Sequence, residues 1–422
     1  MDTSLISGWL PWTLRILAVA AVAAALFRVS PFWLRRRLPW VAGGALVGTA
    51  LIALLVTVSG VADEGLPVGV WFWTCSALLG LGGLAAGVRQ SSWWNLAAVP
   101  LAVLLSLVCA ANSVNISTGY YPSVDAAVGD LSDAPVPQQM GLNEALAAVG
   151  KSSGGRVVAV EIPAEPSGFT HRRELIYLPP AWFRSKTRPK LPVLEMIGGQ
   201  FAAPDNWIRA GQVIKTADDY AAAHNGYAPI LVMADATGNF KTDTECVNGK
   251  PGKAEDHLVK DIPPYIAKTF GSASEARSWG VVGWSMGGTC AVGLAVVHPQ
   301  VFGSFVDISG DASPNLGGKQ TTVDQLFGGD LAAWEAHDPV TVLGRAKKDT
   351  YRNSAGYFLV GSEEGGKHLS DAQTVERAAQ AAGMTTKLEV HPGKHDWQFG
   401  AFAFKQSLPW LAQRIGLPGA TG

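Results

Sequence analysis

The sequence predicts an α/β fold with a mostly parallel, doubly wound sheet, preceded by a region of four transmembrane helices. Two observations predict it. Only 16% of the 422 residues are charged, against roughly 25% in soluble domains, and residues 10–111 carry most of that deficit. From about residue 156, short β-branched runs alternate with amphipathic stretches, as in parallel sheets covered by helices. We therefore expect a membrane anchor over residues 1–111, a linker over 112–155 and an α/β domain over 156–422.

Four apolar stretches in the first part of the chain each approach the ~20 residues that a helix needs to cross a hydrocarbon core. They are Leu10–Val29, Trp40–Gly60, Leu66–Val88 and Trp93–Ala111. A signal peptide followed by buried core helices would explain only the first stretch, and three spans are the main alternative to four. No acidic or His residue lies well inside a stretch, which argues against a transporter core and favours an anchor.

The charges of the connecting loops predict the orientation of this anchor. The first and third loops are basic and the second is acidic: the basic residues are Arg28, Arg35, Arg36, Arg37 and Arg89, and the acidic ones are Asp63 and Glu64. Because Lys and Arg are retained on the cytoplasmic side, the amino terminus and all residues after Ala111 should face outward. The sequence thus predicts a multi-pass protein of the cell membrane with an extracytoplasmic α/β domain.

The charge balance argues against a nucleic-acid-binding protein, and the number of cysteines argues against a disulfide-rich scaffold. A net charge of −1 offers no basic patch, so nucleic acid is not an expected partner. Four cysteines are too few for a disulfide scaffold. Cys246 and Cys290 should lie at the same edge of the sheet in an oxidising compartment, where a disulfide between them and two free buried thiols are both open readings.

The α/β domain has eight expected strands and five expected helices. The strands are Val157–Ile162, Glu174–Leu178, Pro192–Ile197, Ile230–Ala234, Trp279–Gly283, Ser304–Ile308, Tyr357–Val360 and Lys387–His391. The helices are expected near residues 206–224, 255–270, 287–297, 370–382 and 399–414. The stretch from about 311 to 352 breaks this alternation and is long for a plain loop, so it should form a lid or a substrate wall.

The pentapeptide Gly283-Trp-Ser-Met-Gly287 lies between a β-branched strand and a helix of small residues. A serine hydroxyl is a poor nucleophile unless it is exposed, oriented and paired with a base. A tight strand-to-helix turn exposes it, and the flanking glycines are needed because neighbouring chains crowd the turn. With 48 glycines in the chain the bare pattern is weak, and an incidental serine in a glycine-rich turn is the alternative. Its position makes Ser285 the expected nucleophile of an α/β-hydrolase fold.

Backbone donors for a developing oxyanion are expected at two places. An apolar strand ends in Gly198-Gly199, where no side chain would block the approach of a substrate to the backbone. The N–H of Gly199 or of Gln200 would then act together with the N–H of Met286, at the start of the nucleophile helix. A simple glycine turn is the alternative reading of residues 198–199.

The expected base is His395, on the loop after the last strand, where the chain returns beside the nucleophile in this fold. His391 precedes Pro392 on the strand end and is expected to pack. The spacing of these two histidines could suggest a metal site, but Pro392-Gly393 forbids the helix that would align them. We therefore expect no metal site at these histidines and no cofactor.

The acid that orients the imidazole should follow the strand Tyr357–Val360. Glu363 and Glu364 both lie there, and the order serine, acid, histidine along the chain fits the fold. Glu364 is the favoured acid, Glu363 is the first alternative, and Asp307, after the preceding strand, is the second.

Residues of about 156–415 resemble the putative esterase family, which includes esterase D-type enzymes and the actinobacterial mycolyltransferases. Four motifs carry the resemblance, namely Gly283–Gly288, the glycine loop at 198–199, the acidic turn at 361–366 and His395-Asp-Trp397. It implies nucleophile, base and acid roles for Ser285, His395 and Glu364, and oxyanion donors at Gly199 and Met286. The mycolyltransferases have an Asp-Gly pair where this chain has Ile197-Gly198, which puts their sugar-binding arrangement in doubt, and the membrane half is not covered.

The leading functional hypothesis is a serine esterase that cleaves carboxylic esters through an acyl-enzyme. The anchor favours lipid or envelope acyl esters as substrates. An acyltransferase would use the same residues and differ only in passing the acyl group to an alcohol. A serine peptidase and a non-catalytic surface protein are the remaining alternatives, and the complete set of serine, histidine and acid argues against the last.

Overall fold

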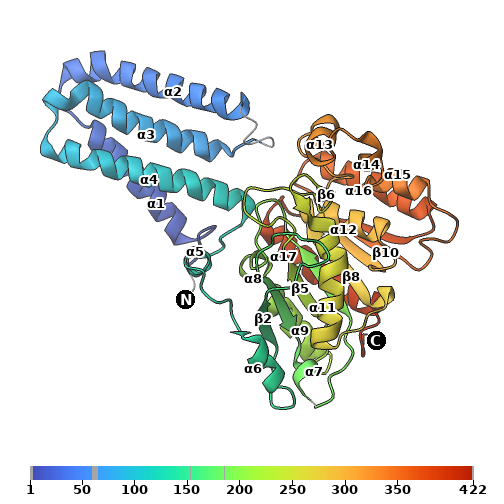
Figure 1. Cartoon of the computed structure of the whole chain (residues 1–422). Coiled ribbons are helices and arrows are strands. Elements are labelled where there is room, and N and C mark those ends of the chain that lie inside the picture. Colours follow the sequence, from blue (N-terminus) through green and yellow to red (C-terminus); the bar gives the residue numbers. More distant parts are fainter. Residues whose placement is uncertain (1–2, 59–64, 153, 185, 421–422) are drawn as a thin grey trace. The chain divides into compact units, whose positions relative to one another are not determined.

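The computed structural model describes residues 3–58, 65–152, 154–184 and 186–420 (Figure 1). The chain forms two compact units, Met1–Asp133 and Ala134–Gly422. Asp63 and Glu64, which enter the orientation argument, lie outside the described residues.

Among its described residues, the first unit contains four helices that are long and apolar enough to cross a membrane. They are α1 (Trp9–Leu26), α2 (Leu38–Val58, continuous with the turn Trp33–Arg37), α3 (Val68–Gly87) and α4 (Trp93–Thr118). Polar side chains bind the helix ends together at the first and third loops. The Arg28 guanidinium donates to the carbonyl of Gly83 at 3.0 Å, and the Asn95 amide donates to the carbonyls of Ala24 and Phe27 at 2.8 Å.

Much of the segment expected to be a linker, residues 112–155, is helical, and the division between the two units falls within it. Helix α4 continues to Thr118 and ends only where Gly119 adopts the left-handed conformation that glycine tolerates best. Two short helices follow, α5 (Val124–Leu131) and α6 (Leu142–Ala147). The polar composition that suggested a spacer therefore reflects helix caps and turns, and the two units divide after Asp133.

The second unit is built on a nine-stranded sheet in the order β1-β2-β3-β5-β4-β8-β9-β10-β11. The strands are β1 (Gln139–Met140), β2 (Arg156–Val160), β3 (Glu174–Leu178), β4 (Val193–Ile197), β5 (Ile230–Ala234), β8 (Trp279–Trp284), β9 (Ser304–Ile308), β10 (Ala355–Gly361) and β11 (Thr385–His391). The pairing is parallel except at β3, which is antiparallel to both of its neighbours. The expected fold is confirmed, with all eight expected strands present and β1 added at the edge.

Helices cover both faces of the sheet (Figure 1). On one face lie α11 (Ile262–Phe270), α12 (Met286–Val297) and α16 (Gly366–Ala381), and on the other lie α9 (Val213–Ala223) and α17 (Trp397–Arg414). The central strands β4, β5 and β8 are buried along their whole length, as expected where helices cover both faces.

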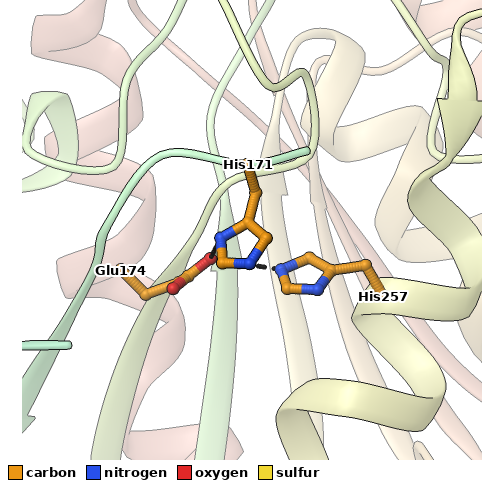
Figure 2. A group of neighbouring side chains, drawn as sticks. All are labelled: His171, Glu174 and His257. Atoms are coloured by element: carbon orange, nitrogen blue, oxygen red, sulfur yellow. Dashed lines mark hydrogen bonds and ion pairs between the residues drawn. The ribbon is translucent and has the colours of Figure 1, made fainter. Parts of the chain in front are cut away.

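A polar cluster is buried at the start of β3, between the sheet and the helical turn that precedes α11. Figure 2 shows its members, His171, Glu174 and His257. Glu174 is the first residue of β3, and His257 begins the turn His257–Asp261. Both of these side chains are fully inaccessible to solvent, so each of their polar atoms must find its partner within the protein.

The excursion between β9 and β10 is helical rather than a plain loop. It contains α13 (Lys319–Leu326), α14 (Leu331–Glu335) and α15 (Pro339–Gly344). Asp330 and Asp338 cap the amino ends of α14 and α15 by accepting backbone N–H groups, which stabilises helices too short to persist by propensity alone.

Candidate active site

Ser285 lies at the turn between β8 and α12, at the carboxyl end of a central strand. Its φ of 59° and ψ of −125° are unfavourable for a residue with a side chain. The backbone N–H of Ser285 donates to Ile308 of β9 at 2.9 Å, and its carbonyl accepts from Gly288 at 2.7 Å, so hydrogen bonds on both sides hold this conformation. The side chain stays partly exposed, as a nucleophile must.

Glycine is required on both sides of Ser285 because the backbone of neighbouring segments leaves no room for a side chain. A Cβ on Gly283 would lie 1.6 Å from the carbonyl oxygen of Gly287. A Cβ on Gly287 would lie 2.2 Å from the carbonyl oxygen of Ile197, in β4. The crowding that the sequence pattern implied is therefore a contact with β4 and a contact within the turn itself.

His395 lies on the loop between β11 and α17, beside Ser285. The Ser285 hydroxyl donates to Nε2 of His395 at 2.8 Å. Asp396 caps α17 by accepting the N–H of Phe399 at 2.9 Å, which fixes the loop next to the imidazole. The ring of Trp284 stacks on that of His395, with 5.3 Å between centroids.

Glu364 follows β10 and reaches the other nitrogen of the same imidazole. Nδ1 of His395 donates to Oε2 of Glu364 at 3.2 Å. The second carboxyl oxygen accepts the Ser309 hydroxyl at 2.8 Å and the N–H of Gly361 at 3.0 Å. The Glu364 side chain is fully inaccessible to solvent and both oxygens are engaged, so its orientation toward His395 is fixed.

The alternative residues for the base and the acid lie elsewhere. Glu363 is exposed. Burial raises the pKa of Asp307 to about 7, and its Oδ1 accepts the N–H of Gly310 at 2.8 Å. His391 contacts Glu389 through Nε2 at 2.9 Å and packs on Phe402. The structure thus brings together Ser285, His395 and Glu364, and it does not bring the alternatives to His395.

The two expected oxyanion donors flank the serine. Met286 is the first residue of α12, so its N–H has no partner within the helix. Gly199 packs against the nucleophile turn, and a Cβ there would lie 3.1 Å from Cβ of Ser285 and 2.8 Å from the ring of Trp284. A side chain at 199 would fill the space above Ser285, which explains a glycine at this position whichever N–H, of Gly199 or of Gln200, acts as the donor.

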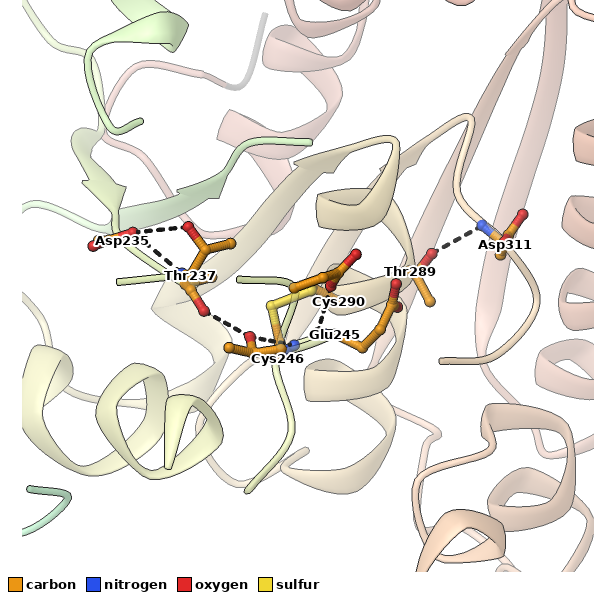
Figure 3. The surroundings of a disulfide bond; sticks show 10 residues. Asp235, Thr237, Glu245, Cys246, Thr289, Cys290 and Asp311 are labelled. Atoms are coloured by element: carbon orange, nitrogen blue, oxygen red, sulfur yellow. Dashed lines mark hydrogen bonds between the residues drawn. A yellow bond between two sulfur atoms is a disulfide. The ribbon is translucent and has the colours of Figure 1, made fainter. Parts of the chain in front are cut away.

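Cys246 and Cys290 form a disulfide that joins the loop after β5 to the nucleophile helix (Figure 3). Their Cα atoms are 5.5 Å apart, and the bond closes a sequence separation of 44 residues. Glu245 and Cys246 have φ of 46° and 54°, a conformation that side chains disfavour. Burial raises the pKa of Glu245 well above its usual range. The disulfide therefore holds a loop that its own local conformation does not favour.

Two neighbours of the site carried no recognisable signal in the sequence. Ser309 supports Glu364 from the end of β9, and the ring of His368 stacks on that of His395 at 4.7 Å between centroids. Burial, followed by the charge of His395, lowers the pKa of His368. Only its spacing four residues after Glu364, across the start of α16, could have suggested His368.

Glu364, His368 and His395 each bring one potential ligand atom within 4.8 Å of the others. However, both nitrogens of His395 are engaged in the hydrogen-bonded chain from Ser285 to Glu364, Nε2 with the Ser285 hydroxyl and Nδ1 with Oε2 of Glu364. A metal ion at this place would compete with the contact that orients the imidazole. These residues are therefore better suited to proton transfer than to holding a cofactor.

Comparisons with known proteins agree with this geometry. A family model described as putative esterase matches residues 170–411. An uncharacterized protein of Corynebacterium glutamicum is 36% identical over 254 residues, which are 60% of this chain and 59% of that protein. The MPT51 antigen of Mycobacterium leprae is 29% identical over 173 residues, 35% of this chain and 54% of that protein. The matches thus cover between half and two thirds of these relatives.

Among solved structures, a ferulic acid esterase superposes with a TM-score of 0.53 at 21% identity, covering 62% of this chain and 99% of that one. At this identity the likeness establishes the shared α/β-hydrolase fold.

Proposed function

The chain belongs to the putative esterase family, and from that premise we propose that it is a membrane-anchored, extracytoplasmic serine esterase that cleaves carboxylic esters through an acyl-enzyme. Ser285 is the nucleophile, His395 the base and Glu364 the acid. Met286 and the Gly198-Gly199 loop supply the oxyanion donors.

One observation carries this proposal, the continuous chain of hydrogen bonds from Ser285 through His395 to Glu364. The two contacts measure 2.8 and 3.2 Å. The three residues come from three separate loops, after β8, β10 and β11, which share one edge of a parallel sheet. A structural role alone would not require a partly exposed serine with a positive φ at the centre of such a chain.

The geometry gives each residue a step. His395 Nε2 takes the Ser285 proton as Oγ attacks the ester carbonyl, and the buried Glu364 carboxylate stabilises the imidazolium that forms. The carbonyl oxygen, now negative, accepts hydrogen bonds from the N–H of Met286 and from the glycine loop. The imidazolium then protonates the leaving alcohol, and an acyl-enzyme remains. Water activated by the same histidine releases the carboxylic acid and restores Ser285.

An exposed aromatic pair supports an apolar substrate. Phe201 lies two residues after Gly199 and is 41% exposed. Its ring packs on that of Phe240, which is 62% exposed, at 5.1 Å between centroids. Large apolar side chains exposed together near a site favour an apolar ligand. Lipid or envelope acyl esters meet this requirement, and a domain tethered to a bilayer encounters them at a high effective concentration.

The outward orientation rests on the basic first and third loops. Protease treatment of intact cells tests it. Cleavage near residues 130–139 from outside, with the Arg35–Arg37 loop protected, is the expected result. Protection of the α/β domain in intact cells would place it in the cytoplasm and reject the extracytoplasmic location.

The activity is tested by turnover of acyl esters of increasing chain length by the full chain in detergent, with Ser285→Ala as the reference. We expect hydrolysis that Ser285→Ala lowers by roughly 10⁴–10⁶-fold. Retention of more than a few per cent of the activity would reject Ser285 as the nucleophile. Adding an alcohol acceptor distinguishes the related reaction: formation of a new ester at the expense of free acid would make the protein an acyltransferase.

A further inference from the structure

The buried cluster of His171, Glu174 and His257 lies outside the site described above and has no part in the proposed reaction (Figure 2). Its members come from the loop before β3, from β3 itself and from the turn that precedes α11. One ligand atom from each lies within 4.8 Å of the other two. Glu174 and His257 are fully inaccessible to solvent, and the His171 side chain is 8% exposed.

Every ring nitrogen in this cluster faces a backbone carbonyl oxygen or a carboxylate oxygen, and both of these accept hydrogen bonds. Nδ1 of His171 lies 2.7 Å from Oε1 of Glu174 and 2.8 Å from the carbonyl oxygen of Arg172, and its Nε2 lies 2.9 Å from the carbonyl oxygen of Ile162. For His257, Nδ1 lies 3.0 Å from Oδ2 of Asp261 and Nε2 lies 3.1 Å from Oε1 of Glu174.

With both carboxylates ionised and with protons alone, this arrangement requires both imidazoles to be cations, because a neutral imidazole has only one N–H. The two rings stack with 4.2 Å between their centroids and 22° between their planes. Two like charges at that distance, away from solvent, repel each other strongly. A single divalent cation between the rings would replace one proton on each and supply the same total charge at one point.

We propose that His171, Glu174 and His257 form a structural site for a divalent transition-metal ion of the zinc class. The ligand atoms are Nδ1 of His171, Oε1 of Glu174 and Nε2 of His257, which is a ligand set that zinc commonly takes. The carbonyl oxygen of Arg172 offers a fourth ligand beside Nδ1 of His171. Two neutral imidazoles, the carboxylates of Glu174 and Asp261 and one divalent ion then sum to zero charge.

The surroundings of the cluster match those of metal-binding residues elsewhere in proteins, where each ligating histidine donates its other N–H to an oxygen. Here His257 would donate Nδ1–H to Asp261 and His171 would donate Nε2–H to Ile162. The second oxygen of Glu174 accepts the N–H of Ile162 at 3.4 Å. The outer contacts that fix the tautomer and orientation of each ligand are thus already present.

A further buried carboxyl group lies near the cluster. Glu195 lies in β4, two strands from β3, and is fully buried. Neither of its carboxyl oxygens has a hydrogen-bond partner among the described residues. Burial, followed by the charge of Glu174, raises the pKa of Glu195 well above its usual range, so this group stays protonated and leaves Glu174 and Asp261 as the carboxylates that the ion would balance.

The role of such an ion is structural. It would join residues 171 and 257, which are distant in sequence, and so connect the loop before β3 to the start of α11. All its ligands are supplied by the protein and closed from solvent, which characterises structural rather than catalytic zinc. Metal binding is then coupled to folding of this part of the sheet.

Metal analysis of the full chain, expressed with a histidine-free affinity tag in zinc-supplemented medium, tests the proposal. The wild type should carry about one zinc per chain, and Glu174→Gln and His257→Gln should each carry below about a tenth of that. Two matched controls should keep the metal: His224→Gln removes the histidine that follows α9 and whose ring contacts the carbonyl and the ring of Tyr220, and His368→Gln disrupts the other three-group cluster of the described residues.

A second measurement applies if the cluster variants fail to fold. Removal of the metal from the wild type by a chelator should lower Tm by on the order of 10 °C, and Zn²⁺ but not Mg²⁺ should restore it. A wild type without stoichiometric metal, whose Tm responds to neither chelator nor Zn²⁺, would overturn the proposal. Zinc that is lost in His368→Gln but kept in Glu174→Gln would equally overturn it, because the ion would then belong to the active site.

Discussion

At the scale of single residues, the site depends on which nitrogen of one imidazole meets which partner. His395 has Ser285 on Nε2 and Glu364 on Nδ1, and a carboxylate on Nδ1 selects the tautomer that leaves Nε2 free to take the serine proton. Glu364 can hold this position because Ser309 and Gly361 engage its second oxygen. The function therefore rests on a chain of contacts in which each residue is oriented by the next.

The two histidines of the last loop should respond very differently to replacement. His395→Ala should lower kcat/KM for an acyl ester by roughly 10⁴–10⁶-fold, nearly as much as loss of the serine, because the two act as a unit. His391→Ala, the control, should lower kcat/KM by less than about threefold, since His391 and Glu389 form an ordinary surface pair. Steady-state kinetics on both variants check this, and the reverse pattern would make His391 the base.

The two adjacent glutamates offer a matched pair for the acid. Glu364→Gln should lower turnover by roughly 10²–10⁴-fold, because an amide cannot stabilise the imidazolium formed during reaction. Glu363→Gln should change turnover by less than about threefold, because that carboxylate is exposed. The account of the acid fails if kinetics show a large loss at Glu363 and none at Glu364.

Asp307 should influence stability rather than catalysis. Burial raises its pKa to about 7, so the folded state keeps a proton that the unfolded chain releases near pH ~4. The contribution of the protonated Asp307 to the free energy of unfolding is therefore fully present below pH ~4 and is lost as the pH rises toward ~7. Asp307→Asn keeps an oxygen to accept the N–H of Gly310 and removes the titration. The Tm of Asp307→Asn relative to that of the wild type should rise between about pH 5 and pH 8. Calorimetry that gives the same Tm difference at the two pH values would contradict this prediction.

At the scale of elements, the turn between β8 and α12 determines the site, and it was predictable. A buried β-branched strand, two glycines and a helix of small residues are local features, and the sterics of Gly283 and Gly287 follow from them. The central strands were predictable for the same reason, because β5 and β8 are apolar runs of five and six residues and β4 is interrupted only by Glu195, a pattern that fits strands covered on both faces.

Other elements could not be predicted because their stability comes from contacts distant in sequence, or because they are helices too short to show a periodic pattern. Strand β1 has only two residues and exists through its pairing with β2. Helices α14 and α15 are five and six residues long and depend on caps at Asp330 and Asp338. The cluster of His171, Glu174 and His257 joins segments 83 residues apart, and a search for closely spaced histidines in the sequence finds only His391 and His395.

The disulfide belongs to this scale because it joins two elements. Replacing Cys246 and Cys290 together by serine should lower the free energy of unfolding by about 2–4 kcal/mol, since the bond closes a loop of 44 residues in the unfolded chain. Denaturant unfolding of the full chain under oxidising conditions measures it. Reductant should lower the stability of the wild type and leave the double variant unchanged. Equal stability of the two proteins without reductant would show that the bond contributes nothing.

At the scale of the whole molecule, the chain combines a bundle of four membrane-competent helices with a hydrolase unit. The contrast in charge between residues 10–111 and the rest was sufficient to predict both units. The division between the units falls inside the segment expected to be a linker, where α4 and α5 continue the helical unit through polar residues. In the proposed arrangement, the anchor selects where the enzyme acts and the aromatic pair Phe201 and Phe240 selects apolar esters.

The central claim is that Ser285 becomes acylated. Reaction of the full chain in detergent with a fluorophosphonate probe, and separately with a slowly hydrolysed acyl ester, followed by peptide mass spectrometry, tests it most directly. The account predicts a single adduct on the peptide containing Ser285, formed at a much lower rate in His395→Ala and absent in Ser285→Ala. An adduct on any other residue, or ester turnover without an adduct at Ser285, would contradict it.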